Sequence, residues 1–102
     1  MRLSDQQCSI IRSAVAEHFG LDAGVWLFGS RVDDSQRGGD IDLYIEAATD
    51  DADELVDAKL NFKVALYKQL GDQKIDVIIR RPGYKEALPI YEIAKRTGVK
   101  LS

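Results

Sequence analysis

The sequence predicts an α+β fold in which helices pack on one small mixed β-sheet. Residues 5–19 and 51–70 carry apolar side chains at helical spacing. Residues 40–46 and 74–80 alternate between apolar and polar side chains, as half-buried strands do. A chain of 102 residues has the length of one ordinary domain, so we expect residues 1–102 to form a single domain.

The first expected element is a helix over residues 5–19. Ser4 and Gln7 have the spacing of a capping box, in which two side chains satisfy two free backbone N–H groups. Gly20 is a typical residue at which a helix ends. One apolar stripe is expected to face the core: Cys8, Ile11, Val15 and Phe19.

Three strands are expected, over residues 24–30, 40–46 and 74–80. The first, "GVWLFGS", is almost entirely apolar, which suits a strand buried on both faces and places Trp26 and Phe28 in a core or an interface. The connection after it is too short for a comfortable parallel crossover, so the first two strands are expected to be antiparallel. The inward faces of the other two strands are Ile41, Leu43 and Ile45, and Ile75, Val77 and Ile79.

Two further helices complete the expected order. The helix over residues 51–70 begins with acidic residues, among which Asp51 and Asp53 suit the positive end of the helix dipole, and it ends at Gly71. Its expected apolar face is Val56, Leu60, Val64 and Tyr67. The last helix begins at Pro89 and ends at Gly98. Its expected apolar residues are Ile90, Ile93 and Ala94.

The amino-acid composition argues against several classes of function. The formal net charge is −3 and the sequence pI about 5.1, which argues against direct nucleic-acid binding, because phosphate contacts need a basic face. One Cys and one His cannot make a zinc cluster, and Cys8 is expected to be a small buried hydrophobe. No apolar run approaches the ~18 residues of a membrane span, and residues 1–10 lack the apolar core of a signal peptide. We therefore expect a cytoplasmic protein without a membrane segment.

Three aspartates are the candidate catalytic and metal-binding residues. Asp40 and Asp42 point to the same face of their strand, roughly 7 Å apart along it, and two such carboxylates either raise each other's pKa or need cations between them. Asp76 has the same position in the third strand, so a parallel pairing of these strands would gather all three carboxylates at one sheet edge. Mg²⁺ is the common divalent ion with oxygen ligands, and two ions about 3.5–4 Å apart can hold the attacking and leaving oxygens of a phosphoryl displacement.

A glycine-serine pair is expected to reach the same edge if the first strand runs antiparallel. Gly29 permits close backbone approach, and Ser30 offers a hydroxyl and an N–H at a possible helix start, where anions bind well. The sequence thus predicts a phosphate-binding turn that faces a metal site.

The stretch "FGSRVDDSQRGGDIDLYIE", followed by "KIDVII", resembles the nucleotidyltransferase superfamily that includes DNA polymerase beta. The signature of that family is Gly-Ser, a spacer, Asp-x-Asp and a distant third Asp on a strand. The resemblance covers residues 26–79. The short length is similar to that of the minimal nucleotidyltransferases (MNT type), which are often antitoxins paired with a helical HEPN-type partner, and the tail "LPIYEIAKRTGVKL" more loosely resembles chains of that group.

The resemblance implies a nucleotidyltransferase fold and a role for each motif residue. Asp40 and Asp42 would hold two Mg²⁺ ions, and Asp76 would complete the site on the acceptor side. Gly29 and Ser30 would hold the β- and γ-phosphates of a nucleoside triphosphate. A secondary phosphate contact would come from Arg31.

The leading functional hypothesis is transfer of AMP from ATP to a hydroxyl, on a HEPN-type toxin by resemblance. Only about twenty residues follow the motifs, so another chain is expected to complete the acceptor pocket, and homo-oligomerisation is left open. One alternative is a non-catalytic module that neutralises a partner by binding. Another is adenylylation of a small molecule, such as an aminoglycoside, with a partner supplying the pocket.

Overall fold

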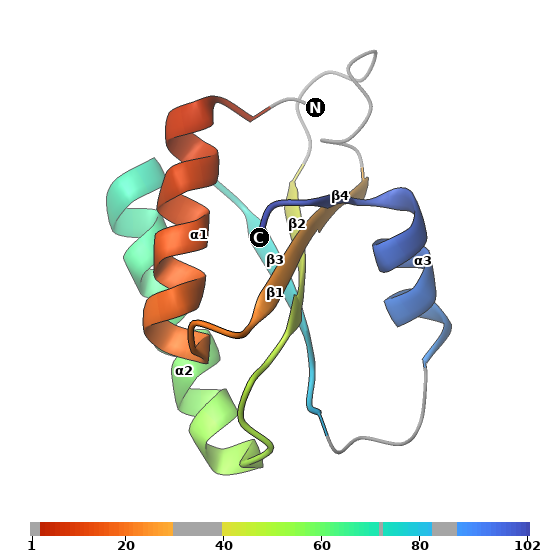
Figure 1. Ribbon diagram of the computed structural model, residues 1–102. Coiled ribbons are helices and arrows are strands. Elements are labelled where there is room, and N and C mark those ends of the chain that lie inside the picture. The colour runs from red at the N-terminus through yellow and green to blue at the C-terminus, as the bar shows by residue number, and fades with distance from the viewer. Residues whose placement is uncertain (1–2, 30–39, 72, 83–87) are drawn as a thin grey trace.

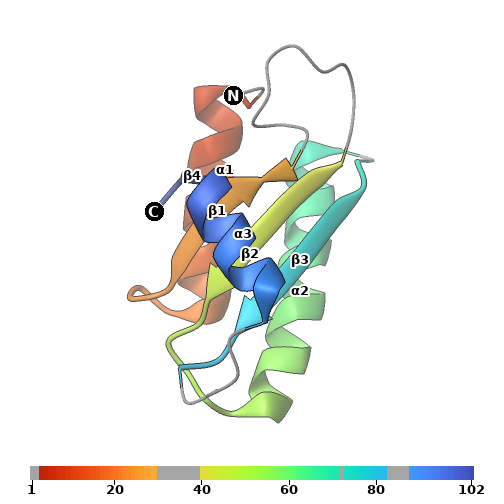
Figure 2. The ribbon, with the colours of Figure 1, turned by 90° about the vertical axis from the view of Figure 1, so that its right-hand side faces the viewer.

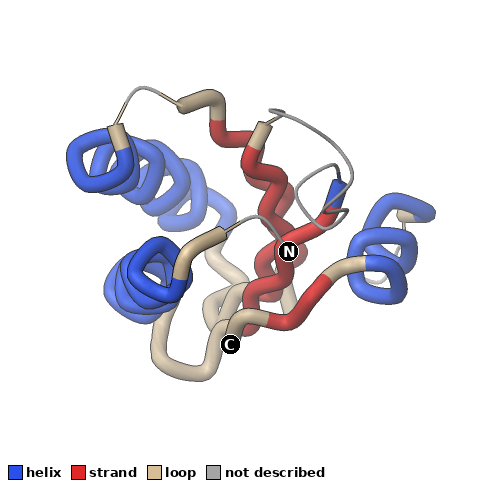
Figure 3. Tube along the Cα trace, turned by 90° about the horizontal axis from the view of Figure 1, so that it is seen from above, coloured by secondary structure: helices blue, strands red, loops and turns tan. Residues whose placement is uncertain are grey.

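The computed structural model describes residues 3–29, 40–71, 73–82 and 88–102. These residues form three layers, which Figure 3 shows from above. The helices α1 (Asp5–Phe19) and α2 (Ala52–Leu70) cover one face of a β-sheet, and α3 (Pro89–Thr97) lies against the other (Figure 1). The predicted α+β class, with helices packed on a small mixed sheet, is confirmed.

The sheet has four strands in the described part of the chain. They are β1 (Gly24–Phe28), β2 (Ile41–Glu46), β3 (Ile75–Arg80) and β4 (Val99–Lys100), in the spatial order β3-β2-β1-β4. The central strands β1 and β2 therefore have a neighbour on each side. Figure 2 looks onto α3 and the sheet face that α3 covers.

The strand directions bring the two predicted motifs to one edge of the sheet. β1 is antiparallel to β2, as the sequence predicted. β2 is parallel to β3, which fulfils the condition under which the three carboxylates were expected to gather. In this register Phe28 is paired with Asp42, and Asp42 is paired with Asp76. The end of β1 and the beginnings of β2 and β3 consequently lie side by side.

The short strand β4 was not predicted. Val99 is paired with Leu27, and Lys100 with Trp26, in an antiparallel arrangement. The pairing continues beyond β4, where the Leu101 N–H donates to the Val25 carbonyl at 2.8 Å. A two-residue strand is too short to show an alternating pattern, and it exists here because the edge of β1 offers it hydrogen-bond partners.

Helix α1 has the predicted bounds, cap and buried face. The Gln7 N–H donates to the Ser4 hydroxyl at 3.1 Å, and the Ser4 N–H donates to the Gln7 side-chain carbonyl at 2.9 Å. These two bonds form the predicted capping box. The buried residues of α1 are Ala14 and the four residues of the predicted stripe: Cys8, Ile11, Val15 and Phe19.

Helix α2 faces the core with a different side from the predicted one. Asp51, which was expected to be the first residue of the helix, is instead its N-cap, and its carboxylate accepts from the backbone N–H groups of Asp53 and Glu54 at 3.0 and 3.2 Å. The buried residues are Leu55, Ala58, Phe62 and Leu66. The predicted core stripe is exposed instead: Val56, Leu60, Val64 and Tyr67. This prediction was wrong because α2 carries two apolar stripes, and the one with the large Phe62 packs edge-to-face on Phe19 at 5.2 Å.

Helix α3 covers a second, smaller core that is largely aromatic. Tyr91 and Ala94 are its buried residues, whereas Ile90 and Ile93, which were predicted to share the apolar face with Ala94, are exposed. Tyr91 is buried in their place because its ring packs on Tyr44, which in turn packs on Trp26. Trp26 and Tyr44 lie 5.4 Å apart, and Tyr44 and Tyr91 5.7 Å apart, between ring centres. Trp26 is thus a core residue, as predicted.

Candidate active site

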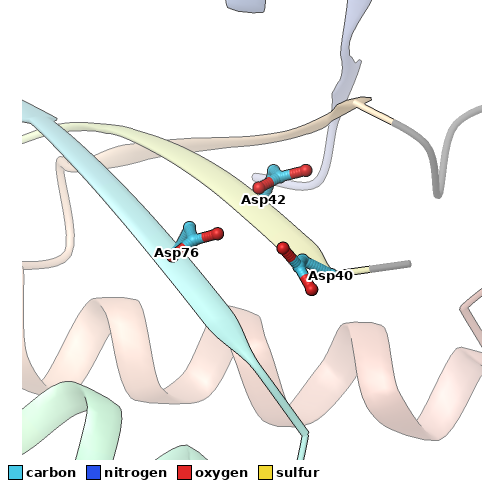
Figure 4. A group of neighbouring side chains, drawn as sticks. All are labelled: Asp40, Asp42 and Asp76. Carbon is cyan, nitrogen blue, oxygen red and sulfur yellow. The ribbon is translucent and has the colours of Figure 1, made fainter.

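Three carboxylates meet where β2 and β3 begin. Asp40 immediately precedes β2, Asp42 is the second residue of β2, and Asp76 is the second residue of β3. One carboxylate oxygen from each of the three lies within 4.8 Å of the others (Figure 4). Because side chains alternate along a strand, Asp42 lies on the same sheet face as Tyr44, opposite the main core.

The close approach of these carboxylates makes the ionisation of Asp42 costly. The pKa of Asp42 is raised, first by partial burial and then by the negative charges of Asp76 and Asp40. Lys74 opposes this effect and lowers the pKa. Its ammonium lies 3.5 Å from an Asp40 oxygen, but 70% of its side chain is exposed, so water screens much of this ion pair.

The donor set fits a hard divalent cation. All three groups offer oxygen ligands, which Mg²⁺ and similar ions prefer, and their mutual repulsion would be relieved by positive charge between them. The structure therefore brings together the three aspartates that the sequence singled out. Their assignment as catalytic and metal-binding residues stays a prediction.

Gly29 lies directly against this cluster. Its φ is +78°, a conformation that favours glycine, and it follows the last residue of β1. A Cβ atom at this position would collide with a carboxylate oxygen of Asp42 and would lie 3.2 Å from the Asp42 Cγ. The absence of a side chain at Gly29 is therefore what gives the Asp42 carboxylate its space.

Two predicted phosphate-binding residues, Ser30 and Arg31, lie outside the described residues. Their proposed contacts with phosphate stay predictions. Gly29 is the member of that motif that the structure describes.

Sequence reasoning did not assign Lys74 to the site. It precedes Asp76 by two residues, so the strand period directs both side chains to one face. This two-residue spacing from Asp76 is the sequence feature from which the position of Lys74 beside the cluster could have been predicted. The lysine places a positive charge beside the carboxylates, 3.5 Å from an Asp40 oxygen.

At the other end of the sheet, away from the three aspartates, several polar side chains contact one another. The Tyr44 hydroxyl donates to Glu46 at 2.9 Å, and burial together with this bond raises the pKa of Tyr44 to about 12. Glu46 also pairs with Lys95 at 3.3 Å. A cavity of about 390 Å³ lies at this end of the sheet, lined in part by Glu46, Arg80 and Lys100. The register of the strands separates this cavity from the three aspartates.

The described helices include none that is both long enough and apolar enough to cross a membrane.

Comparison with known proteins identifies the family. A search of curated proteins finds no match. The family model that describes the nucleotidyltransferase domain matches residues 8–100, which is nearly the whole chain and contains all three aspartates. The fold agrees with this match, and the chemistry of such a domain is the transfer of a nucleotidyl group. The chain therefore belongs to the nucleotidyltransferase domain family.

Proposed function

We propose that this protein transfers AMP from ATP to a hydroxyl group of a partner protein, in a reaction that requires Mg²⁺. The observation that carries the proposal is the convergence of the Asp40, Asp42 and Asp76 carboxylates within 4.8 Å beside Gly29. Such a cluster is costly for a metal-free protein and useful for one that binds cations with a polyphosphate.

Each aspartate has a proposed role. Asp40 and Asp42 would hold two Mg²⁺ ions, and Asp76 would complete the ligand set on the acceptor side. When bound, the ions supply charge neutralisation at the phosphate oxygens and lower the pKa of an attacking hydroxyl.

The proposed reaction is an in-line displacement at the α-phosphorus. The acceptor hydroxyl oxygen forms a bond to the α-phosphorus, while the bond from that phosphorus to the bridging oxygen of the β-phosphate breaks. The electron pair of that bond leaves with pyrophosphate, and the hydroxyl proton passes to the Asp76 carboxylate or to water. Catalysis of this kind rests mainly on positioning and on stabilisation of charge.

The phosphate chain would lie across Gly29, Ser30 and Arg31. A glycine without a Cβ allows the β- and γ-phosphates to approach the backbone, where N–H groups serve as donors. Lys74 lies on the same side and is able to exchange its contact with Asp40 for one with a phosphate oxygen.

We propose a HEPN-type helical protein as the acceptor and an antitoxin role for the reaction, because AMP on a toxin hydroxyl would block its activity. The resemblance to minimal nucleotidyltransferases supports this choice. The position of the carboxylates supports it too, since the Asp40 side chain is 40% exposed and a hydroxyl on a protein surface is able to reach it.

The test combines the protein, ATP and Mg²⁺ with the product of the neighbouring gene and measures the intact mass of both chains. We expect AMP-sized additions on the partner, lost in EDTA and lost in Asp42→Asn. Asp51→Asn is the matched control, because Asp51 belongs to the second Asp-x-Asp pair and asparagine caps helices as well as aspartate does.

Two outcomes would contradict the proposal. Neutralisation of the partner that survives in Asp42→Asn, without any mass addition, would indicate a non-catalytic binding module. If Asp51→Asn reduces the mass addition as much as Asp42→Asn does, the three aspartates at the sheet edge would no longer be assigned as the active site.

A further inference from the structure

The outer face of α2 carries an apolar stripe that the fold does not cover. The stripe is Val56, Leu60, Val64 and Tyr67, and the exposed fractions of Val56 and Leu60 are 69% and 64%. These residues recur at helical spacing and lie away from the buried stripe that contains Phe62. A continuous apolar stripe on a protein surface typically marks an interaction site.

The charges of α2 indicate which partner fits. The first six residues of the helix, 52–57, contain three acidic side chains and no basic one: Asp53, Glu54 and Asp57. The remaining residues, 58–70, contain three lysines and no acidic side chain: Lys59, Lys63 and Lys68. A second copy of α2 that runs antiparallel would set each acidic half against a basic half. A parallel copy would set like charges together.

We propose that two copies of this chain associate through α2, with the two helices antiparallel about a twofold axis. Such an axis produces a self-complementary interface, in which each contact occurs twice. The apolar stripe supplies most of the association energy, and the charges fix the direction of the helices.

Helix geometry gives the register of this pairing. The axis passes near the middle of the stripe, so Val56 of one copy lies opposite Tyr67 of the other, and Leu60 lies opposite Val64. With a rise of about 1.5 Å per residue, Asp57 of one copy and Lys68 of the other lie about 3 Å apart along the direction of the helix axes. Within the described residues neither of these two side chains has an ion-pair partner in its own chain, so both are available to the second copy.

This arrangement leaves the carboxylate cluster accessible. α2 lies on the sheet face of the main core, whereas Asp42 lies on the face of α3. Two chains joined through α2 therefore carry their clusters on opposite outer sides. The inference does not depend on the proposed transfer reaction.

The test is sedimentation equilibrium of the purified chain over a concentration series. We expect the native sequence to show twice the chain mass of 11.4 kDa at high concentration. Leu60→Asp is expected to raise the dimer dissociation constant at least about tenfold. Leu21→Asp is the matched control, because Leu21 is 89% exposed and lies outside the stripe, and it is expected to leave the constant unchanged.

A charge-reversal pair tests the direction of the helices. Asp57→Lys and Lys68→Asp are each expected to weaken the dimer, and the double variant is expected to restore it toward the native constant. Far-ultraviolet circular dichroism of every variant checks that the fold is kept.

Several results would overturn the proposal. A native chain that stays monomeric at all concentrations would assign the stripe to another occupant, such as a different helical protein. A dimer insensitive to Leu60→Asp would place the interface elsewhere. A double variant no better than the single ones would exclude the antiparallel pairing.

Discussion

Replacement of Gly29 by alanine tests whether the end of β1 shapes the candidate site. A Cβ at Gly29 would collide with an Asp42 carboxylate oxygen, and this carboxylate would have to move away by about 1 Å. Misplacement of a reacting group by about 1 Å can cost about 10²-fold in rate, which corresponds to about 2.7 kcal/mol. We therefore expect Gly29→Ala to lower nucleotidyl transfer by about two orders of magnitude and to weaken Mg²⁺ binding.

Gly71→Ala is the matched control for this experiment. Gly71 has a similar φ of +86°, so alanine is strained there too, but a Cβ at Gly71 would meet nothing within 4 Å. Both variants are expected to lose about 1–3 kcal/mol of unfolding free energy from backbone strain. Only Gly29→Ala is expected to lose activity beyond what this loss of stability explains.

The measurements are urea unfolding, Mg²⁺ titration and the initial rate of transfer for both variants and the native protein. If Gly29→Ala and Gly71→Ala lose stability equally and both keep the native rate and Mg²⁺ affinity, the contact between Gly29 and Asp42 has no functional consequence. The reasoning from the geometry would then be refuted.

Three further predictions concern stability. Phe62→Ala removes a fully buried ring and is expected to lower the unfolding free energy by about 3–5 kcal/mol in urea; a loss below about 1 kcal/mol would contradict the packing. Ser4→Ala removes the acceptor of the Gln7 N–H bond and is expected to cost about 1 kcal/mol in the same assay, so an unchanged midpoint would count against the cap. Because the pKa of Asp42 is raised in the folded state, its ionisation costs stability as the pH rises through that pKa. In EDTA at pH 7, Asp42→Asn should therefore have a higher Tm than the native protein, and this difference in Tm should disappear below pH 3.8, the ordinary pKa of an aspartate. Added Mg²⁺ should raise only the native Tm. A variant with a lower Tm than the native protein in EDTA would contradict the raised pKa of Asp42.

The sequence predicted which side chains share a face of each strand, and the antiparallel direction of β1 and β2, because short-range rules decide both. The two-residue period of a strand fixes which side chains share a face, and the brief connection after Gly29 fixes the antiparallel direction of β1 and β2. These rules place Asp42 and Asp76 at the same position in their own strands, whereas the parallel pairing of those strands entered the sequence analysis only as a condition. The observed pairing of Asp42 with Asp76 fulfils this condition.

The wrong predictions concern places where the local sequence allows two arrangements equally well and tertiary packing selects one of them. In α2, two stripes have helical spacing, and only the fit of Phe62 against Phe19 selects the buried one. In α3, the isoleucines are exposed because Tyr91 stacks on Tyr44, a contact between residues that are far apart in the sequence. The strand β4 depends on the free edge of β1, which a two-residue pattern does not reveal.

The central position of β2 also governs how the carboxylate cluster opens and closes in solution. Asp42 is carried by a strand that has neighbours on both sides, and the Ile41 N–H donates to the Lys74 carbonyl at 3.0 Å. Fraying of a terminus or of an edge strand leaves the pairing of β2 with β1 intact, so the β2 amides that donate to β1 should exchange with deuterium only when the centre of the sheet opens. The Ile41 amide, which donates toward the edge strand β3, should exchange earlier. Asp42 should thus keep its place for as long as the protein stays folded, while Asp76, on the edge strand β3, lies on a backbone with a lower barrier to local opening.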